Sequence, residues 1–274
     1  MTAGASDGKP YLGIGAIYRW EADYLREWVA FHRLVGVERF FLYDNASEDD
    51  HLEALAPFIE DGSVVVHEWP VFPGQGPAYD HCLAVHGEEV RWLAFLDVDE
   101  FLFSPEGRPL PEVLRRYERH PGVGVSRAWM GTSGHRTKPE GPVLANFSSR
   151  LHLPEPNRSV KSVVDPSRVV RRVNEHWFEY AGGAQAVDEH EQPLESWTRD
   201  LSFDVLRVNH YFTKSEEEAL AKFARPQAGG GKLRGRLNPE GLRRRNERHG
   251  RPDHVIQQYL PALEQALAEL VGRR

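Results

Sequence analysis

An apolar run that ends in a cluster of carboxylates constrains this chain most strongly. Residues 92–96 are short, bulky and aromatic, a pattern typical of a fully buried strand. The run leads directly into Asp97-Val98-Asp99, and residues two apart in an extended chain point to the same side. In an open α/β sheet, ligands bind at the carboxyl ends of such strands. We therefore expect a binding site at Asp97 and Asp99.

The expected ligand of this pair is a divalent cation. Two neighbouring carboxylates repel each other unless a cation lies between them. Mg²⁺ or Mn²⁺ is the natural choice, because both ions favour oxygen ligands. Such an ion would in turn bind a diphosphate. The alternative is a strand that simply ends in an acidic turn, but the apolar residues before the pair and Glu100-Phe101-Leu102 after it favour the site.

The first hundred residues alternate between strand and helix patterns. Helical spacing of apolar residues separates the short apolar runs, and this alternation predicts a mostly parallel sheet with helices on its faces, an α/β fold. The predicted strands are 11–17, 39–43, 64–69 and 92–96, and the predicted helices between them are 21–35, 51–59 and 78–89. Later residues give weaker strand patterns between 123 and 211, and helical patterns at 214–225 and 255–270.

The bulk composition excludes several classes of protein. The chain has 274 residues and a formal net charge of −7, which gives no general attraction to nucleic acid. Its single cysteine, Cys82, excludes an intramolecular disulfide and is typical of a reducing compartment. We find no apolar signal core and no run of about 18 apolar residues, so we expect no transmembrane segment and a cytoplasmic protein.

Five stretches, in this order and spacing, carry a family resemblance. They are residues 21–28 with Phe31-His32, residues 34–40 with 43–47, the set Gln75, Tyr79 and Cys82-Leu83, residues 92–102, and residues 209–215. Together they resemble glycosyltransferase family 92 and the related bacterial branch near family 2. One departure is Trp20, where the family usually has Asn before the Glu.

The resemblance implies a GT-A fold, a nucleotide-sugar donor, expected to be UDP-linked, and a divalent metal. It also implies inversion at the anomeric carbon and points to galactose, since characterised members are β-galactosyltransferases. We expect a disordered N-terminus at 1–10, the GT-A catalytic domain at 11–225, and a flexible basic loop followed by a C-terminal helix at 226–274.

The resemblance also implies roles for the metal-site residues. In GT-A enzymes the second Asp of the pair usually contacts the metal directly, so Asp99 is the expected ligand and Asp97 faces the ribose or a metal-bound water. A distal histidine often completes the metal shell, and His210 at the end of a predicted strand is the candidate. The alternative for His210 is a core histidine that binds backbone.

Asp97 and six further residues are expected to contact the donor. Asp44 and Asn45 would meet the nucleoside, although they can equally form a turn that caps the next helix. Tyr18 would contact the base and Gln75 would cover the donor. Lys161 and Lys214 are candidate diphosphate clamps, with the alternative that each is an ordinary solvated lysine.

An inverting transferase needs a carboxylate base near the acceptor. The region between the two histidines 176 and 210 is expected to carry it. Asp188, Glu189 and Glu191 lie there beside His190, and Glu175 lies just before His176. The sequence does not choose among them, and we favour Asp188 or Glu189. His176 and Trp177 would line the acceptor pocket, or would belong to the core.

Two other functions share the predicted fold. A nucleotidyltransferase that makes the activated sugar would need a glycine-rich phosphate loop after the first strand, and Tyr18-Arg19-Trp20-Glu21 lacks the glycines. A non-catalytic carbohydrate-binding or partner-binding domain is the other alternative, and the intact Asp97-Val98-Asp99 argues against it. The acceptor, whether glycan, lipid-linked sugar or small molecule, is not encoded in a recognisable motif.

Overall fold

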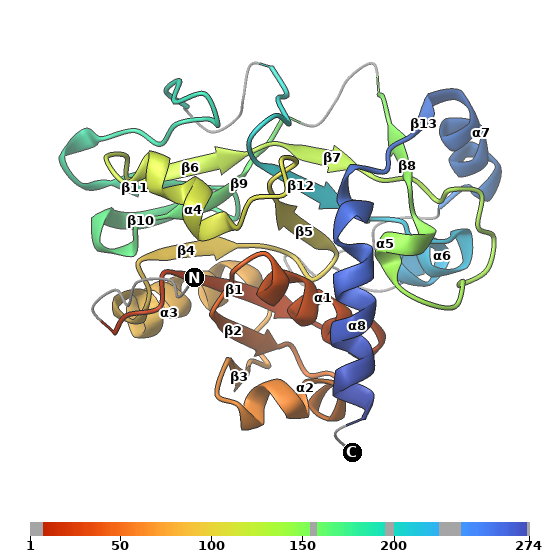
Figure 1. Ribbon diagram of the computed structural model, residues 1–274, viewed down its shortest axis with the longest axis horizontal. Coiled ribbons are helices and arrows are strands. Elements are labelled where there is room, and N and C mark those ends of the chain that lie inside the picture. Colours follow the sequence, from red (N-terminus) through yellow and green to blue (C-terminus); the bar gives the residue numbers. More distant parts are fainter. Residues whose placement is uncertain (1–7, 154–157, 195–199, 225–236, 273–274) are drawn as a thin grey trace.

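The computed structural model describes residues 8–153, 158–194, 200–224 and 237–272, and its centre is a six-stranded sheet (Figure 1). In spatial order the strands are β3 (Val64–Glu68), β2 (Arg39–Asp44), β1 (Leu12–Tyr18), β4 (Trp92–Phe95), β9 (Lys161–Val164) and β6 (Gly122–Val125). The first four are parallel, and β9 runs antiparallel to both of its neighbours. The predicted α/β class with a mostly parallel, GT-A-type sheet is therefore confirmed.

Alternate residues of each strand point to opposite faces of this sheet, where they pack against helices. In β2, Phe40 and Leu42 pack with the helices of one face, and Phe41 and Tyr43 pack with the helix of the other. The first face is covered by α1 (Ala22–Leu34) and α2 (His51–Glu60), and the second by α3 (Gln75–His86). A Cβ at Gly15 would lie 2.9 Å from the Cys82 sulfur, so glycine allows α3 to approach β1 closely.

The structure also contains a second, smaller sheet of three strands. Its order is β5 (Glu100–Phe103), β12 (Arg207–His210) and β7 (Arg127–Trp129), with β12 antiparallel to β5 and parallel to β7. In this register His210 lies opposite Glu100 on one side and Trp129 on the other. The small sheet therefore brings residues from three distant parts of the chain to the end of β4.

The remaining elements surround these sheets. The strands are a β10 (Val169–Asn174)–β11 (Trp177–Tyr180) hairpin and a pair of β8 (Ser149–Leu151) with β13 (Gly250–Pro252). The helices are α4 (Leu110–Leu114), α5 (Val143–Asn146), α6 (Glu216–Ala224), α7 (Pro239–His249) and α8 (Leu260–Val271). Short 3₁₀ turns are η1 (Gly87–Glu89), η2 (Arg115–Tyr117), η3 (Pro166–Arg168), η4 (Ala181–Gly183) and η5 (Val255–Tyr259).

The helix α8 lies along α1 on the outside of the central sheet (Figure 1). Leu263 of α8 and Ile256 just before it are buried in the same apolar core as α1. The C-terminal segment thus contributes to the core that surrounds the first strands. Within the described part of the chain, no helix is both long and apolar enough to cross a membrane.

Two details differ from the sequence-based expectations. Residues 123–130, which carry one of the weaker strand patterns and are expected to form a single strand, form two strands, β6 in the central sheet and β7 in the small one, because the chain passes from one sheet to the other at Ser126. The charged residues 239–249 form helix α7, for which the sequence showed no apolar periodicity. The whole basic segment 226–236 and residues 1–7 of the N-terminal segment 1–10 lie outside the described residues, so the expectations for them are not tested.

Candidate active site

The carboxylate pair lies in a tight turn between β4 and β5, not in extended chain as expected. The Glu100 amide donates to the Asp97 carbonyl oxygen at 2.9 Å, which closes the turn. The Asp97 amide donates in return to the Glu100 carboxylate, also at 2.9 Å. The chain turns here because β4 belongs to the central sheet and β5 to the small one. The turn still leaves both aspartates at the carboxyl end of β4.

The third predicted metal ligand joins them from β12. The ligand atoms of Asp97, Asp99 and His210 all lie within 4.8 Å of one another. The Nε2 atom of His210 is 3.5 Å from Asp99 Oδ1, and both side chains are 7% exposed. Residues more than a hundred positions apart in sequence are therefore brought together as the resemblance implied.

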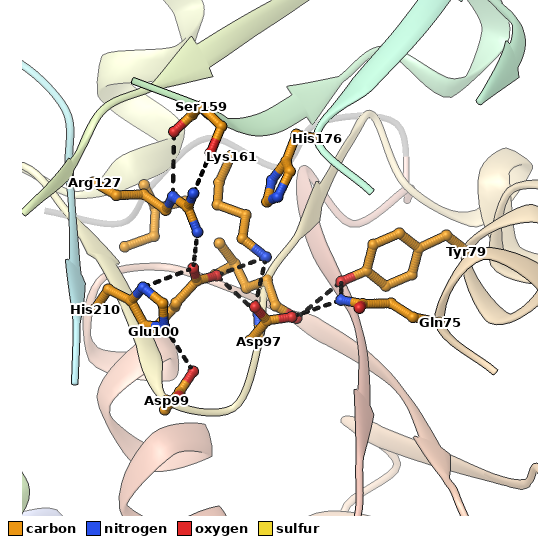
Figure 2. A network of polar contacts seen from close by, with 12 residues as sticks. Gln75, Tyr79, Asp97, Asp99, Glu100, Arg127, Ser159, Lys161, His176 and His210 are labelled. Carbon is orange, nitrogen blue, oxygen red and sulfur yellow. Dashed lines mark hydrogen bonds and ion pairs between the residues drawn. The ribbon is translucent and has the colours of Figure 1, made fainter. Parts of the chain in front are cut away.

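Glu100 is the centre of a buried ionic network behind this cluster (Figure 2). Its carboxylate accepts ion pairs from Lys161 Nζ at 2.9 Å and from Arg127 Nη1 at 3.3 Å. His210 Nδ1 lies 3.8 Å from the same carboxylate. Burial alone would raise the pKa of Glu100, but Lys161, His210 and Arg127 hold that pKa below its usual value. Glu100 is therefore an anion that fixes the positions of its neighbours.

Asp97 is held from two sides. Gln75, the first residue of α3, donates to Asp97 Oδ1 at 2.7 Å, and Lys161 Nζ lies 2.9 Å from Oδ2. Gln75 also contacts the hydroxyl of Tyr79 one turn further along α3 (Figure 2). The Asp97 side chain is 33% exposed, so it presents a fixed carboxylate edge to solvent.

Asp99 has cationic partners from the second half of the chain. Lys222 of α6 forms a short ion pair with Oδ2, and His210 faces Oδ1. Burial would raise the pKa of Asp99, but the charges of Lys222 and His210 outweigh it and hold that pKa well below its ordinary value. Lys222 also donates to the Phe212 carbonyl oxygen at 3.1 Å.

The residues present fit a divalent cation of the magnesium or manganese type. Two carboxylates and one imidazole are ligands that Mn²⁺ accepts, and carboxylates suit Mg²⁺. Two ligands on opposite sides of such an ion are about 4.2 Å apart. The 4.8 Å spread of Asp97, Asp99 and His210 would close around one ion with small side-chain shifts.

The predicted nucleoside contacts lie at the same edge of the sheet, and two of them, Asp44 and Asn45, already have protein partners. Tyr18 and Asp44 are paired in register at the ends of β1 and β2. Asp44 accepts from the Ser47 amide at 2.9 Å, so it forms the turn that the sequence also allowed. Asn45 donates to the carbonyl oxygens of Trp69 at 2.7 Å and Val71 at 2.9 Å. Asn45 thus ties down the loop before α3.

The two predicted phosphate clamps occupy different places. Lys161 is 1% exposed and lies inside the network, between Asp97 and Glu100. Lys214 is 8% exposed; its Nζ lies 3.4 Å from Glu21 Oε2 and 3.6 Å from the centre of the Tyr24 ring. It lines a pocket together with Lys222, Phe212 and Trp20. Neither lysine is an ordinary solvated side chain.

The predicted acceptor contacts are His176 and Trp177. They are adjacent at the β10–β11 turn, but their side chains have different neighbours. His176 points toward Lys161 (Figure 2). Burial and the charges of Lys161 and Arg127 lower the pKa of His176 to about 3, so its ring is neutral near pH 7. Trp177 lines a different, shallow pocket with Val170 and Tyr180.

The two favoured base candidates are occupied elsewhere. Glu189 is 3% exposed, and its carboxylate accepts from the amides of Asp204, Val205 and Leu206 at 2.7–2.9 Å. Asp188 accepts from the amides of His190 and Gln192 in its own turn, both at 2.9 Å. Neither forms a hydrogen bond or ion pair with Asp97, Asp99 or His210 in the described structure. The structure therefore does not bring Asp188 and Glu189 to the cluster.

Three residues of the site were not singled out from the sequence: Glu100, Arg127 and Lys222. Arg127 had a usable signal, because a lone arginine among the apolar residues of a predicted strand must be paired if it is buried. Glu100 was seen only as part of the strand motif. Lys222 had no signal, since its contact with Asp99 depends on how α6 docks.

Comparison with known proteins agrees with this geometry. Residues 13–227, most of the chain, match the profile of glycosyltransferase family 92. The chain belongs to glycosyltransferase family 92. The matched region begins in β1 and includes Asp97, Asp99, His210 and Lys222. It ends at residue 227, shortly after the last of the sequence motifs at residues 209–215.

The curated family 92 relatives are longer than this chain. A family 92 protein from Arabidopsis thaliana is 32% identical over 221 residues, which are 75% of this chain and 36% of that protein. Galactan beta-1,4-galactosyltransferase GALS2 of the same plant is 32% identical over 120 residues, 40% of this chain and 23% of that protein. The chain thus spans about a quarter to two fifths of the length of the curated relatives it matches.

Among solved structures, the likeness is partial. Glucosyl-3-phosphoglycerate synthase from Mycobacterium tuberculosis aligns with a TM-score of 0.35 and 19% identity, covering 58% of this chain and 57% of that one. TarS of S. aureus aligns with a TM-score of 0.39 and 11% identity, covering 57% of this chain and 47% of that one.

Proposed function

We propose that this family 92 chain is a metal-dependent, inverting glycosyltransferase that moves a hexose from a UDP-linked donor to a hydroxyl of a glycan. The observation that carries the proposal is the convergence of Asp97, Asp99 and His210 at the carboxyl end of β4. Galactose is the first donor sugar to test, because matched relatives include galactan galactosyltransferases. The cytoplasmic location stays a prediction.

The chain's own residues would prepare the donor site. Asp99 and His210, with Asp97, would hold the divalent ion, which when bound would neutralise charge on the leaving diphosphate. Gln75 and Lys161 fix the Asp97 carboxylate before any donor arrives, so that little order is lost on binding. The buried Glu100 holds Lys161 and Arg127 in place behind the site.

The acceptor hydroxyl would enter through the pocket beside Asp99. That pocket is lined by Lys214 and Lys222 and by four acidic side chains: Glu21, Asp23, Glu217 and Glu218. An inverting transfer needs a carboxylate base near this hydroxyl. Since the carboxylates of Asp188 and Glu189 already accept hydrogen bonds from backbone amides elsewhere, we place the base among these four. Arg19-Trp20 after β1, without glycines, gives no support to a nucleotidyltransferase.

Calorimetric titration of UDP and GDP, with and without Mn²⁺, tests the donor site. We expect wild type to bind UDP more tightly than GDP and only with Mn²⁺. Asp99→Ala should weaken UDP binding at least about ten-fold. The matched control is Asp61→Asn, which removes a half-exposed carboxylate paired with Arg33 and should leave binding unchanged.

Absence of binding for either nucleotide under every condition would overturn the donor-site assignment. Where UDP binds, NMR detection of the anomeric product from UDP-galactose and galactan oligomers tests the reaction. A product with inverted configuration supports the proposal, and retention contradicts it. Amide variants of Glu21, Asp23, Glu217 and Glu218 in the same assay should identify the base by a lost kcat with unchanged UDP binding.

A further inference from the structure

The ammonium group of Lys222 occupies one carboxylate oxygen of Asp99, the residue expected to bind the metal ion directly. It forms an ion pair with Asp99 Oδ2, while His210 Nε2 lies 3.5 Å from Oδ1. Lys222 is further fixed by the Phe212 carbonyl oxygen at 3.1 Å and by the face of the Phe212 ring, whose centre is 4.4 Å from Nζ. Its side chain is 23% exposed, so this is a well-formed, partly buried contact.

The charges of the site are already balanced in this arrangement. When the His210 ring is neutral, as it must be to bind a metal ion, three carboxylates, Asp97, Asp99 and Glu100, meet three cations, Lys161, Arg127 and Lys222, among the described residues. A divalent ion added to this set would be repelled by the ammonium a few ångströms away. Without Lys222 the same site carries one net negative charge, which favours a cation.

Lys222 is the one cation of the three that has room to leave. Lys161 is 1% exposed and Arg127 is 5% exposed, and both are enclosed by Glu100 and its neighbours. Lys222 instead lines the open pocket that Lys214 also lines. A change of rotamer would keep its ammonium in this pocket, close enough to meet an anionic diphosphate.

We infer that Lys222 is a tethered cation that competes with the divalent ion for Asp99 and so sets the metal affinity of the site. The inference rests on the proposed metal-dependent function. It assigns Lys222 two positions: on Asp99 in the free enzyme, and in the pocket with Lys214 once the ion is bound. The lysine is a positioning residue that keeps Asp99 ordered when no metal is present.

Titration of Mn²⁺ alone into nucleotide-free protein tests the competition between Lys222 and the ion. Electron paramagnetic resonance measures the free Mn²⁺ at each step of the titration. Lys222→Met keeps an unbranched side chain that is one heavy atom shorter and removes its charge. We expect it to bind Mn²⁺ about ten-fold more tightly than wild type or better. The matched control is Lys138→Met, which removes a lysine of the same pocket that pairs with Asp23 rather than with Asp99.

The outcomes separate this inference from the proposed function. Tighter Mn²⁺ binding in Lys222→Met, unchanged binding in Lys138→Met and loss of binding in Asp99→Asn would support the competition. Equal or weaker binding in a folded Lys222→Met, with Asp99-dependent binding in wild type, would overturn it and leave the metal site standing. Absence of Mn²⁺ binding in both wild type and Lys222→Met would overturn the metal site as well.

A measurement on wild type keeps the inference testable if Lys222→Met does not fold. Amine acetylation read by mass spectrometry reports how accessible each lysine is. Saturating Mn²⁺ should increase labelling of Lys222 several-fold, because the ammonium leaves Asp99, and should leave Lys138 unchanged. Labelling of Lys222 that is the same or lower with Mn²⁺ would contradict its displacement.

Discussion

Lys161 shows how a single side chain can organise a site without touching solvent. Its ammonium lies 2.9 Å from both Asp97 and Glu100, and burial, which would lower its pKa, is outweighed by these two carboxylates, which raise it. The sequence predicted Lys161 as a phosphate clamp. The sequence thus predicted that Lys161 belongs to the site, but not that it pairs with Asp97 and Glu100. These ion pairs form only because β9 lies beside β4 in antiparallel register.

Removal of this charge should destabilise the protein. In Lys161→Met, Glu100 remains fully buried with Arg127 as its main counter-charge, and Asp97 loses a partner. Breaking a buried ion pair from one side typically costs about 3 kcal/mol or more. We expect a loss of this size in the free energy of unfolding, measured by urea denaturation.

The control for this prediction is an exposed pair. Lys138 contacts Asp23 with exposed fractions of 42% and 70%, so Lys138→Met should change the unfolding free energy by well under about 1 kcal/mol. If both lysine variants unfold at the same urea concentration as wild type, the buried network does not stabilise the fold as we argue.

At the scale of elements, a buried histidine helps to join α1 to the small sheet. His32 Nδ1 donates to the Trp28 carbonyl oxygen at 2.8 Å, and its Nε2 accepts from the Leu102 amide of β5 at 3.1 Å. The bond that Nε2 accepts requires the neutral ring, because a protonated Nε2 cannot accept. Burial lowers the pKa of His32 to about 3, against about 6.5 for an exposed histidine.

This histidine should make stability depend on pH in a defined direction. Between pH 6.5 and about 3, the unfolded chain binds a proton at His32 that the folded chain does not. The stability from the neutral ring is therefore complete above pH 6.5 and is lost as the pH falls. From pH 6.5 to pH 5 the loss is about 2 kcal/mol.

His32→Gln tests this, because glutamine is polar but does not titrate. The unfolding free energy of wild type should fall between pH 7 and pH 5 relative to that of His32→Gln, as measured by urea denaturation at each pH. Curves that stay parallel over this range would show that His32 does not control the response. Comparison with the variant cancels the other titrating groups, which both proteins share.

The sequence predicted the elements of the first hundred residues well and those after them less well. Local periodicity was enough where strand and helix alternate, as at β2 and α1, because each buries a regular apolar face. It was not enough for β12, which pairs with β5 and β7 across a long sequence separation. The His210 ligand could be placed by resemblance, whereas the contact of Lys222 with Asp99 depends on packing that no local pattern encodes.

At the scale of the whole molecule, the C-terminal helix belongs to the main core. Leu263 of α8 is fully buried, and Tyr259 donates to the Ser104 carbonyl oxygen at 2.9 Å while its ring packs edge-on against Phe31 of α1. Domain boundaries drawn from the sequence at residue 225 separated this helix from the catalytic part. The packing joins it to the helix that covers the central sheet.

Leu263→Ala should therefore destabilise the whole fold and not α8 alone. Truncation of a fully buried leucine typically costs about 3 kcal/mol. Helical circular dichroism and tryptophan fluorescence should shift together to lower urea, because the core tryptophans Trp28 and Trp92 unfold in the same step. Val271→Ala, at a 60% exposed position of the same helix, should shift neither signal by more than about 0.5 kcal/mol. An early loss of circular dichroism in Leu263→Ala, with fluorescence unchanged, would instead show that α8 unfolds on its own.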